Sequence, residues 1–385
     1  MPIKKIESQN IKATPKTTKQ GLPALTKKPA NRAGGRKTSP KTQKGTQAGT
    51  LGIEKFEKNP ILQPDEANSW ESKATFNPAA LYEDGKVHLL YRAIGDKDIS
   101  VLGYASGNNG FQFEYKSVEP AYLPPQWLET DASKIAYRSP SGGGVGGSED
   151  PRATRVGDRI YVTYTDFNGW RAPRVALTSI DVQDFLDGRW NWKSPVLLSP
   201  PGEMHKNWAI FPEKINGQYA ILHSISPEVL VDYFNDLDFD GSTYIKSYYR
   251  AEPRKNCWDT MVRGIGPPPI RTKYGWLVIY HATDKTDPGR YKMGAMILDA
   301  ENPTKILYRS PVPLLAPDEE YENSGFKAGV VYSCGAVVID GKLLIYYGGA
   351  DSVVCVASTD LDEFLEELKR IGSPSMKTKK IAFKR

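Results

Sequence analysis

The chain has 385 residues, of which 39% are hydrophobic and 25% are charged, a composition typical of a globular protein with a sizeable core. No apolar run approaches the roughly 18 residues of a membrane span, and none follows Lys4 and Lys5 as in a secretory signal. Cys257, Cys334 and Cys355 are odd in number and far apart, which argues against disulfides and a cysteine zinc site and favours the cytoplasm. With only four histidines as well, we expect no metal and no bound cofactor.

The net charge of +6 belongs to the N-terminal segment. Residues 1–50 contain twelve Lys and Arg against one acid, whereas the remainder has 39 basic against 44 acidic residues. A segment so poor in large apolar residues cannot bury enough surface to fold, so we predict a disordered basic tail. A nucleic-acid partner is expected only through this tail, and the lack of aromatic residues before Phe56 favours a solvated extension instead. Residues 372–385 form a second, shorter basic tail.

Between the tails, residues 51–371 are rich in short β-type runs, each entered through a glycine. The glycines lie 72, 60, 58 and 66 residues apart, and each run is preceded by a small-residue or proline-bearing segment and followed by another β-type run. The runs are 87–91, 159–164, 218–222, 276–280 and 342–347, and the runs that follow them are 101–106, 174–179, 244–249, 292–298 and 353–358.

Fourth strands fit residues 111–115, 190–193 and 306–309, and the segments that open the copies begin at Asn77, Asp150, Phe211, Pro267 and Ser333. Five copies of about 60 residues with four strands each predict an all-β chain, a five-bladed β-propeller. A pair of β-sandwiches is the alternative. Residues 360–370 carry the only convincing helical pattern and predict a short C-terminal helix.

The copy that opens at Asp150 contains the most informative motif, a glycine-rich run that ends in Glu149-Asp-Pro-Arg152. The glycines let the backbone approach a ligand, but the Lys and Ser/Thr of a phosphate-binding P-loop are missing. An Asp beside an Arg on an inner strand suits acid catalysis. A structural Asp–Arg pair explains the same residues equally well. In a propeller, Asn77 and Glu213 would face the same axis.

Several motifs in order resemble glycoside hydrolase family 130, the mannoside phosphorylases and β-mannosidases. They are Asn77-Pro-Ala-Ala with Leu89-Leu-Tyr-Arg-Ala, Glu149-Asp-Pro-Arg, Lys206-Asn with Phe211-Pro-Glu-Lys, Gly264-Ile-Gly-Pro-Pro-Pro-Ile with Gly275-Trp-Leu-Val-Ile-Tyr-His, Val330-Val-Tyr-Ser-Cys-Gly, and Tyr346-Tyr-Gly-Gly-Ala-Asp351. The resemblance covers about residues 57–365 and implies a five-bladed propeller.

The resemblance also implies inverting cleavage of β-mannosides, in many members with inorganic phosphate as the co-substrate. Asp150 matches the family's proton donor, which acts through a sugar hydroxyl. Asn77, Arg92, Lys206, Asn207 and Asp351 match positions that contact sugar or phosphate, and His281 matches a phosphate-site position. We therefore expect the sugar to be bound by Asn77, Arg92, Arg152, Lys206, Asn207 and Asp351, and phosphate by Arg92, Lys206 and His281.

Three functions stay open at this point. The first is phosphorolysis, which gives α-mannose 1-phosphate. The second is hydrolysis by an inverting β-mannosidase with Glu213 as the base, since Ser224 stands where many phosphorylases have an arginine. The third is a non-catalytic propeller that binds carbohydrate or protein. The sequence also leaves open the linkage, the acceptor sugar and whether the chain forms a homo-oligomer.

Overall fold

A computed structural model describes residues 51–123, 144–169, 171–248, 253–254 and 257–373, all within the unit Gln47–Arg385. Both predicted tails and the first part of the glycine-rich run lie outside the described residues, apart from residues 372 and 373. The described part is mostly β-structure, as predicted, and its strands form four hydrogen-bonded sheets. No helix in these ranges is both long and apolar enough to cross a membrane.

The largest sheet has eight strands in the order β2-β3-β4-β6-β7-β8-β9, with β5 paired to β4. Two antiparallel sets are joined in it by a short parallel pairing of β4 with β6, Ile99 to Gly146 and Ser100 to Gly147. The strands are β2 (Ala74–Glu83), β3 (Lys86–Ile94), β4 (Ile99–Gly107), β5 (Tyr115–Lys116), β6 (Gly146–Val156), β7 (Arg159–Phe167), β8 (Arg174–Asp181) and β9 (Val196–Leu197).

The other three sheets are antiparallel and have fewer strands. Their orders are β10-β11-β12, then β13-β15-β16-β17 with β14 on β15, and finally β1-β20-β19-β18. The strands are β10 (Ala209–Ile210), β11 (Tyr219–Ile225), β12 (Val229–Phe234), β13 (Met261–Ile265), β14 (Ile270–Thr272), β15 (Gly275–Asp284), β16 (Asp287–Leu298), β17 (Ile306–Arg309), β18 (Val331–Ile339), β19 (Lys342–Gly349), β20 (Val353–Asp360) and β1 (Glu54–Lys55).

Tight turns set the register of the hairpins. At Asp84-Gly85 and Asp340-Gly341 both residues have positive φ, 48° and 70° in the first turn and 47° and 79° in the second. That conformation matches the twist of the strands it joins. Two of the five glycines on which the repeat was predicted, Gly85 and Gly341, therefore lie between β2 and β3 and between β18 and β19, where the backbone needs them.

In the ranges that the structure describes, three short helices accompany the strands: α2 (Val182–Leu186), α3 (Glu320–Asn323) and α4 (Leu361–Ile371). Helix α4 confirms the predicted C-terminal helix. The Asp360 side chain caps it by accepting from the Glu363 N–H, and it buries Phe364, Leu365 and Leu368. That apolar face joins the core cluster of β15, β16 and β19.

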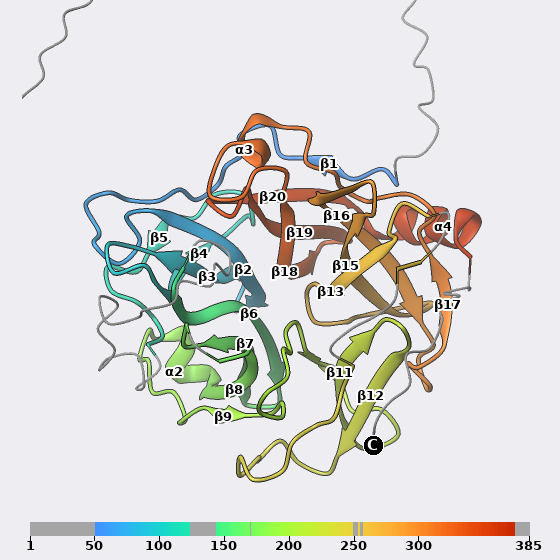
Figure 1. Cartoon of the computed structure of the whole chain (residues 1–385), viewed down its shortest axis with the longest axis horizontal. Coiled ribbons are helices and arrows are strands. Elements are labelled where there is room, and N and C mark those ends of the chain that lie inside the picture. Colours follow the sequence, from blue (N-terminus) through green and yellow to red (C-terminus); the bar gives the residue numbers. More distant parts are fainter. Residues whose placement is uncertain (1–50, 124–143, 170, 249–252, 255–256, 374–385) are drawn as a thin grey trace, which may run out of the picture. The chain divides into compact units, whose positions relative to one another are not determined.

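The sheets follow one another in chain order around a common centre (Figure 1). Strand β2 packs against β6, β6 against β10, β11 against β13, β16 against β18, and β18 back against β2. Strand β1 pairs with β20, Glu54 opposite Ser358, so the first described strand completes the last sheet. The first strands of the sheets therefore bring their side chains toward the centre.

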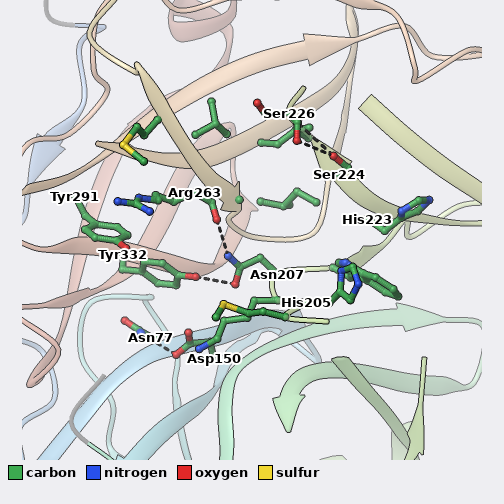
Figure 2. Close-up of a pocket in the computed structure, with 18 of the residues that line it drawn as sticks. Asn77, Asp150, His205, Asn207, His223, Ser224, Ser226, Arg263, Tyr291 and Tyr332 are labelled. Atoms are coloured by element: carbon green, nitrogen blue, oxygen red, sulfur yellow. Dashed lines mark hydrogen bonds between the residues drawn. The ribbon is translucent and has the colours of Figure 1, made fainter. Parts of the chain in front are cut away.

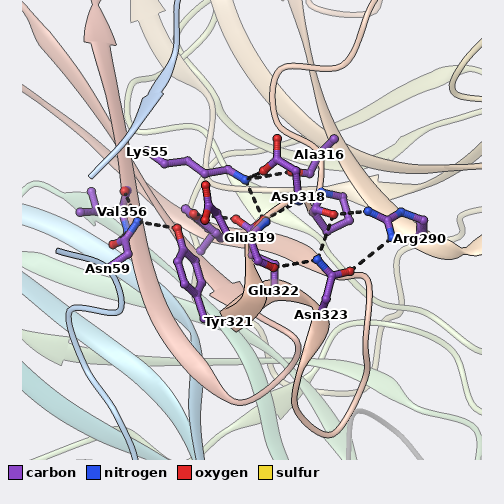
Figure 3. A network of polar contacts seen from close by, with 12 residues as sticks. Lys55, Asn59, Arg290, Ala316, Asp318, Glu319, Tyr321, Glu322, Asn323 and Val356 are labelled. Carbon is purple, nitrogen blue, oxygen red and sulfur yellow. Dashed lines mark hydrogen bonds and ion pairs between the residues drawn. The ribbon is translucent and has the colours of Figure 1, made fainter. Parts of the chain in front are cut away.

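Strand β1 and the segment after it are also held in place by hydrogen bonds and ion pairs (Figure 3). Lys55 donates to the Glu322 carboxylate of α3 at 2.7 Å and also pairs with Asp318. Glu322 is completely buried and accepts from the Tyr347 hydroxyl at 2.9 Å. Asn59 donates to the carbonyl of Val356 at 2.9 Å. These bonds hold the start of the described chain to α3, β19 and β20.

Three strand predictions were wrong. Residues 244–248 form no strand, because the chain turns back at Ser226-Pro227 and β12 pairs with β11 in the place expected for them. The fourth strand of the second copy is β9, not residues 190–193, and β5 begins at Tyr115 rather than at Phe111. In the segment 190–193 the aromatic side chain of Trp190 contributes to packing rather than to a strand, since it packs edge-on against Tyr104 and Phe185.

Candidate functional site

A cavity of about 620 Å³ opens at the centre of the sheets (Figure 2). It is lined by charged, amide, aromatic and apolar side chains from β2, β3, β6, β11, β13, β16 and β18 and from the loops around Asn207, Lys327 and Asp351. A concave cavity in which a few polar groups converge among apolar and aromatic side chains is the usual form of a small-molecule site. Six of the nine site residues predicted from the sequence line it: Asn77, Arg92, Asp150, Lys206, Asn207 and Asp351.

Strained backbone brings four of these side chains to the cavity. Asn77, Asp150, Asn207 and Asp351 have φ of 47°, 52°, 65° and 52°, a region that costs residues other than glycine roughly 1–3 kcal/mol. The strand pairing slips at the first two, between Phe76 and Ala79 and between Glu149 and Arg152. A β-bulge of this kind redirects a side chain out of its sheet, and here it directs an amide and a carboxyl to one point.

Asp150 is the centre of a buried charge network. Its Oδ1 accepts from Asn77 Nδ2 at 2.9 Å and from Arg92 Nη1 at 3.2 Å. Arg92 also reaches Glu149 Oε1 at 3.2 Å, and Lys206 Nζ lies 2.9 Å from Glu149 Oε2. Two carboxylates and two cations are thus held together at the cavity, a balance that burial requires.

Arg152 lies behind this network rather than on the cavity wall. Its guanidinium donates to the carbonyls of Asp150, Ile265 and Gly266 at 2.7–2.8 Å and to Asn207 Oδ1 at 3.1 Å. Asn207 Oδ1 also accepts from the Tyr332 hydroxyl at 2.7 Å. Arg152 therefore joins β6 to β13 and fixes the bulge that carries Asp150. Its contacts are those of a supporting residue.

Comparison with known proteins places the chain among characterised enzymes. Residues 52–370 match the model of a family described as β-1,4-mannooligosaccharide phosphorylase, glycoside hydrolase family 130. This chain belongs to that family. The resemblance found in the sequence motifs is thereby confirmed.

Two curated relatives of the GH130 chain come from Thermoanaerobacter sp. strain X514. A 1,2-β-oligomannan phosphorylase is 35% identical over 81% of this chain and 98% of its own length. A β-1,2-mannobiose phosphorylase is 32% identical over 79% of this chain and 96% of its own.

A solved GH130 structure also superposes on the chain, with a TM-score of 0.65 at 26% identity, over 82% of this chain and 96% of its own. It is described with the statement that this family of mannoside phosphorylases contains glycoside hydrolases that target β-1,2-mannosidic linkages in Candida mannan.

The two aspartates that line the GH130 cavity have opposite pKa shifts. Burial raises the pKa of Asp150, but the charges of Arg92 and Lys206 and the hydrogen bond from Asn77 outweigh it and lower the pKa below the usual value. Burial raises the pKa of Asp351 to about 6, although Lys327 opposes the shift. Carboxyls whose surroundings separate their pKa values are typical of acid–base sites.

Besides Arg152, two predicted site residues do not reach the cavity. The inner-strand position predicted for Glu213 is wrong, since β10 ends at Ile210 and the side chain is exposed on the following loop, outside the cavity lining. His281 is completely buried, stacks on Tyr332 at 3.7 Å and accepts from the Ser333 N–H at 2.9 Å. Burial and the nearby Arg152 lower the pKa of His281 to about 3, which favours the neutral ring.

The residues of the cavity wall that sequence reasoning missed include Arg263, Tyr291, Lys327 and Tyr332. Tyr332 lies within a motif that supported the resemblance, and Arg263 directly precedes another. Neither Tyr291 nor Lys327 belongs to a motif, and only the packing of β16 beside β18 brings them together. The described residues contain no group of three or more His, Cys, Asp or Glu that could hold a metal ion.

Proposed function

We propose that this chain catalyses inverting phosphorolysis of β-mannosides, giving α-mannose 1-phosphate and a shortened acceptor. The proposal rests above all on the near full-length match to two phosphorylases that act on β-1,2-linked mannosides. A cavity that contains cations as well as buried carboxyls suits a reaction between a neutral sugar and a phosphate dianion. Inorganic phosphate is the only co-substrate in this proposal, with no metal and no bound cofactor.

In this mechanism Asp150 supplies the proton. Phosphate oxygen forms a bond to the anomeric carbon from the face opposite the leaving group, and the glycosidic C–O bond breaks. The proton of Asp150 passes through a sugar hydroxyl to the leaving oxygen, and configuration changes from β to α. Cations hold Asp150 ionised in the described site. A bound phosphate dianion would offset them and favour the protonated form that the reaction needs.

The remaining residues of the network have supporting and binding roles in this proposal. Asn77, Arg92, Lys206, Asn207 and Asp351 would contact the sugar, since all five line the cavity. Arg92 and Lys206 would also face phosphate, with their charges partly offset by Glu149. Arg152 would act as a positioning residue for Asp150 and Asn207.

We also propose that the sheets are the five blades of a propeller with residues 51–371 as its catalytic domain. The blades are β2–β5, β6–β9, β10–β12, β13–β17 and β18–β20 with β1. The parallel β4–β6 pairing joins the first two blades into the eight-stranded sheet. An experimental structure with a different number of sheets around the centre would contradict this count.

One experiment tests the function. Purified protein is incubated with β-1,2-mannobiose, β-1,2-mannotriose and β-1,4-mannobiose, with and without phosphate, and free mannose and α-mannose 1-phosphate are measured. We expect cleavage of the β-1,2-linked substrates that depends on phosphate and releases α-mannose 1-phosphate. Equal release of free mannose without phosphate would establish the hydrolase, for which Glu213 is badly placed, and no cleavage of any β-mannoside would favour a binding protein.

A further inference from the structure

The two neighbouring carboxylates at the bulge of β6 share one arginine. In a regular strand, the side chains of neighbouring residues point to opposite faces of the sheet. The register shift between Glu149 and Arg152, with a φ of 52° at Asp150, interrupts this alternation. Arg92 Nη1 donates to Asp150 Oδ1 and Arg92 Nη2 donates to Glu149 Oε1, each at 3.2 Å. One guanidinium thus holds both carboxylates together beside the cavity.

Lys206 is attached to the same group through Glu149. Its Nζ lies 2.9 Å from Glu149 Oε2. Lys206 and Arg92 both line the cavity, whereas Glu149 is completely buried and does not line it. Glu149 is therefore out of contact with a sugar in the cavity, but it helps to determine where two cations of the lining lie.

The charge of Glu149 also bears on the proton that Asp150 has to carry. A general acid must be protonated before it acts, and nearby cations oppose its protonation. Although burial raises the pKa of Asp150, Arg92 and Lys206 lower it. Because both cations also contact Glu149, part of their charge is offset there. The negative charge of Glu149 itself favours protonation of its neighbour.

We infer that Glu149 is a positioning residue for the proton donor, which holds Arg92 and Lys206 in place and by its charge keeps Asp150 able to bind a proton. This inference rests on the proposed role of Asp150 as the acid, and it adds a second carboxylate that acts only through its neighbours. No proton passes through Glu149. The proton still moves from Asp150 through the sugar hydroxyl to the leaving oxygen.

Other titratable and charged groups of the described residues also face Asp150. They are Arg92 on β3, Arg152 on β6, Lys206 in the loop before β10, His281 on β15, Tyr332 and Cys334 on β18, and Asp351 after β19. Burial lowers the pKa of His281 to about 3 and raises the pKa values of Tyr332 and Cys334, so these three keep their charge near neutral pH. Burial raises the pKa of Asp351 to about 6. Among these groups, Asp351 is the one whose titration must be separated from that of Asp150.

The test measures kcat of the full chain against pH, at saturating β-1,2-mannobiose and phosphate, because kcat reports groups of the enzyme–substrate complex. Glu149→Gln removes the charge with little change of shape, and Glu149→Asp keeps the charge. Lys206→Met and the double variant Glu149→Gln/Lys206→Met form a second pair, in which the double variant loses one charge of each sign. Glu203→Gln is the matched control, because Glu203 pairs with His205 of the lining at 3.0 Å but does not line the cavity itself.

We expect Glu149→Gln to move the alkaline limb, where kcat falls as pH rises, to lower pH by about one unit or more. The loss of kcat should then be about tenfold above both limbs and should diminish as pH falls, because Asp150 regains its proton in both proteins. Lys206→Met should move the limb to higher pH, and adding Glu149→Gln should move it down again. Glu149→Asp and Glu203→Gln should keep the wild-type limb. The ionisation of phosphate is common to all of these proteins.

Identical limbs in the wild type and Glu149→Gln, with a loss of kcat that is equal at every pH, would overturn the inference and leave Glu149 a structural residue. If Glu149→Gln does not fold, identical limbs in Lys206→Met and the double variant would overturn it in the same way. A shift that disappears when the comparison is repeated with Asp351→Asn in both proteins would assign the limb to Asp351 instead. Failure of the proposed function looks different, because the wild-type protein would then cleave without phosphate or not at all.

Discussion

Glu149 and Glu322 are both completely buried and both paired with lysine, yet their surroundings differ. Glu322 accepts from Lys55, from the Tyr347 hydroxyl and from the backbone N–H groups of residues 318 and 319. None of residues 318–323 has positive φ, and none lines the cavity. Glu149 precedes a strained aspartate that does line it. Burial and pairing thus occur in a stabilising network as well as in a candidate site, and strain beside a cavity distinguishes the two.

The largest expected effect tests the strained network. Asp150→Asn should lower turnover by about 10²–10⁴-fold, the usual contribution of general acid catalysis, because the amide cannot supply the proton. The variant should fold and bind mannoside, which thermal unfolding and ligand titration would check. Near wild-type turnover would mean that Asp150 is a structural residue. The Glu149–Asp150 network would then be a stabilising network like that of Glu322.

The Glu322 network should instead affect stability. Glu322→Gln leaves Lys55 without its buried partner, and loss of one member of a buried pair destabilises by about 3 kcal/mol or more. Denaturant unfolding should show this loss, with kcat/KM of the folded enzyme unchanged. Asp318→Asn is the control, because that carboxyl is 72% exposed and its pairing should contribute less than about 1 kcal/mol. A fall in kcat/KM with unchanged stability in Glu322→Gln would mean that the Glu322 network serves catalysis rather than stability.

The raised pKa of Asp351 predicts a pH-dependent stability. The folded state binds a proton more tightly than the unfolded chain, so Asp351 reduces stability as pH rises from about 4 to about 6. Asp351→Asn should match the wild type below that window and exceed it above, by up to about 3 kcal/mol. Turnover should fall if Asp351 contacts the sugar. Unfolding free energies between pH 4 and 8 would test this, and parallel curves for the two proteins would contradict it.

The smallest effect is expected at the N-terminus. Every residue assigned to the site lies beyond residue 70, so deletion of residues 1–50 should change kcat/KM by less than about twofold. The deletion keeps Leu51, which is buried in the core cluster of β15, β16 and β19. Steady-state kinetics of the truncated enzyme measure the effect. A large loss of activity would mean that the basic segment acts at the pocket.

The sequence by itself determined most of the strands and the acid motif. The runs of β-branched and aromatic residues became β3, β7, β11, β15 and β19, because alternation and tight turns are local properties of the chain. Asn77 and Asp150 were found because each belongs to a short motif, and both lie within strands, β2 and β6. The register shifts that turn them into the cavity occur within those same few residues.

Only the tertiary structure decided which polar residues face the cavity. Glu213 lies two residues past Phe211 in a family motif, but the early end of β10 leaves it exposed. His281 follows a run of core residues, and its ring is buried against Tyr332, on which it stacks. Arg263, Tyr291 and Lys327 are far apart in sequence, and they meet because β13 and β16 share a sheet and β16 packs against β18. Burial and charge balance at such a junction depend on neighbours from several sheets, which no local pattern contains.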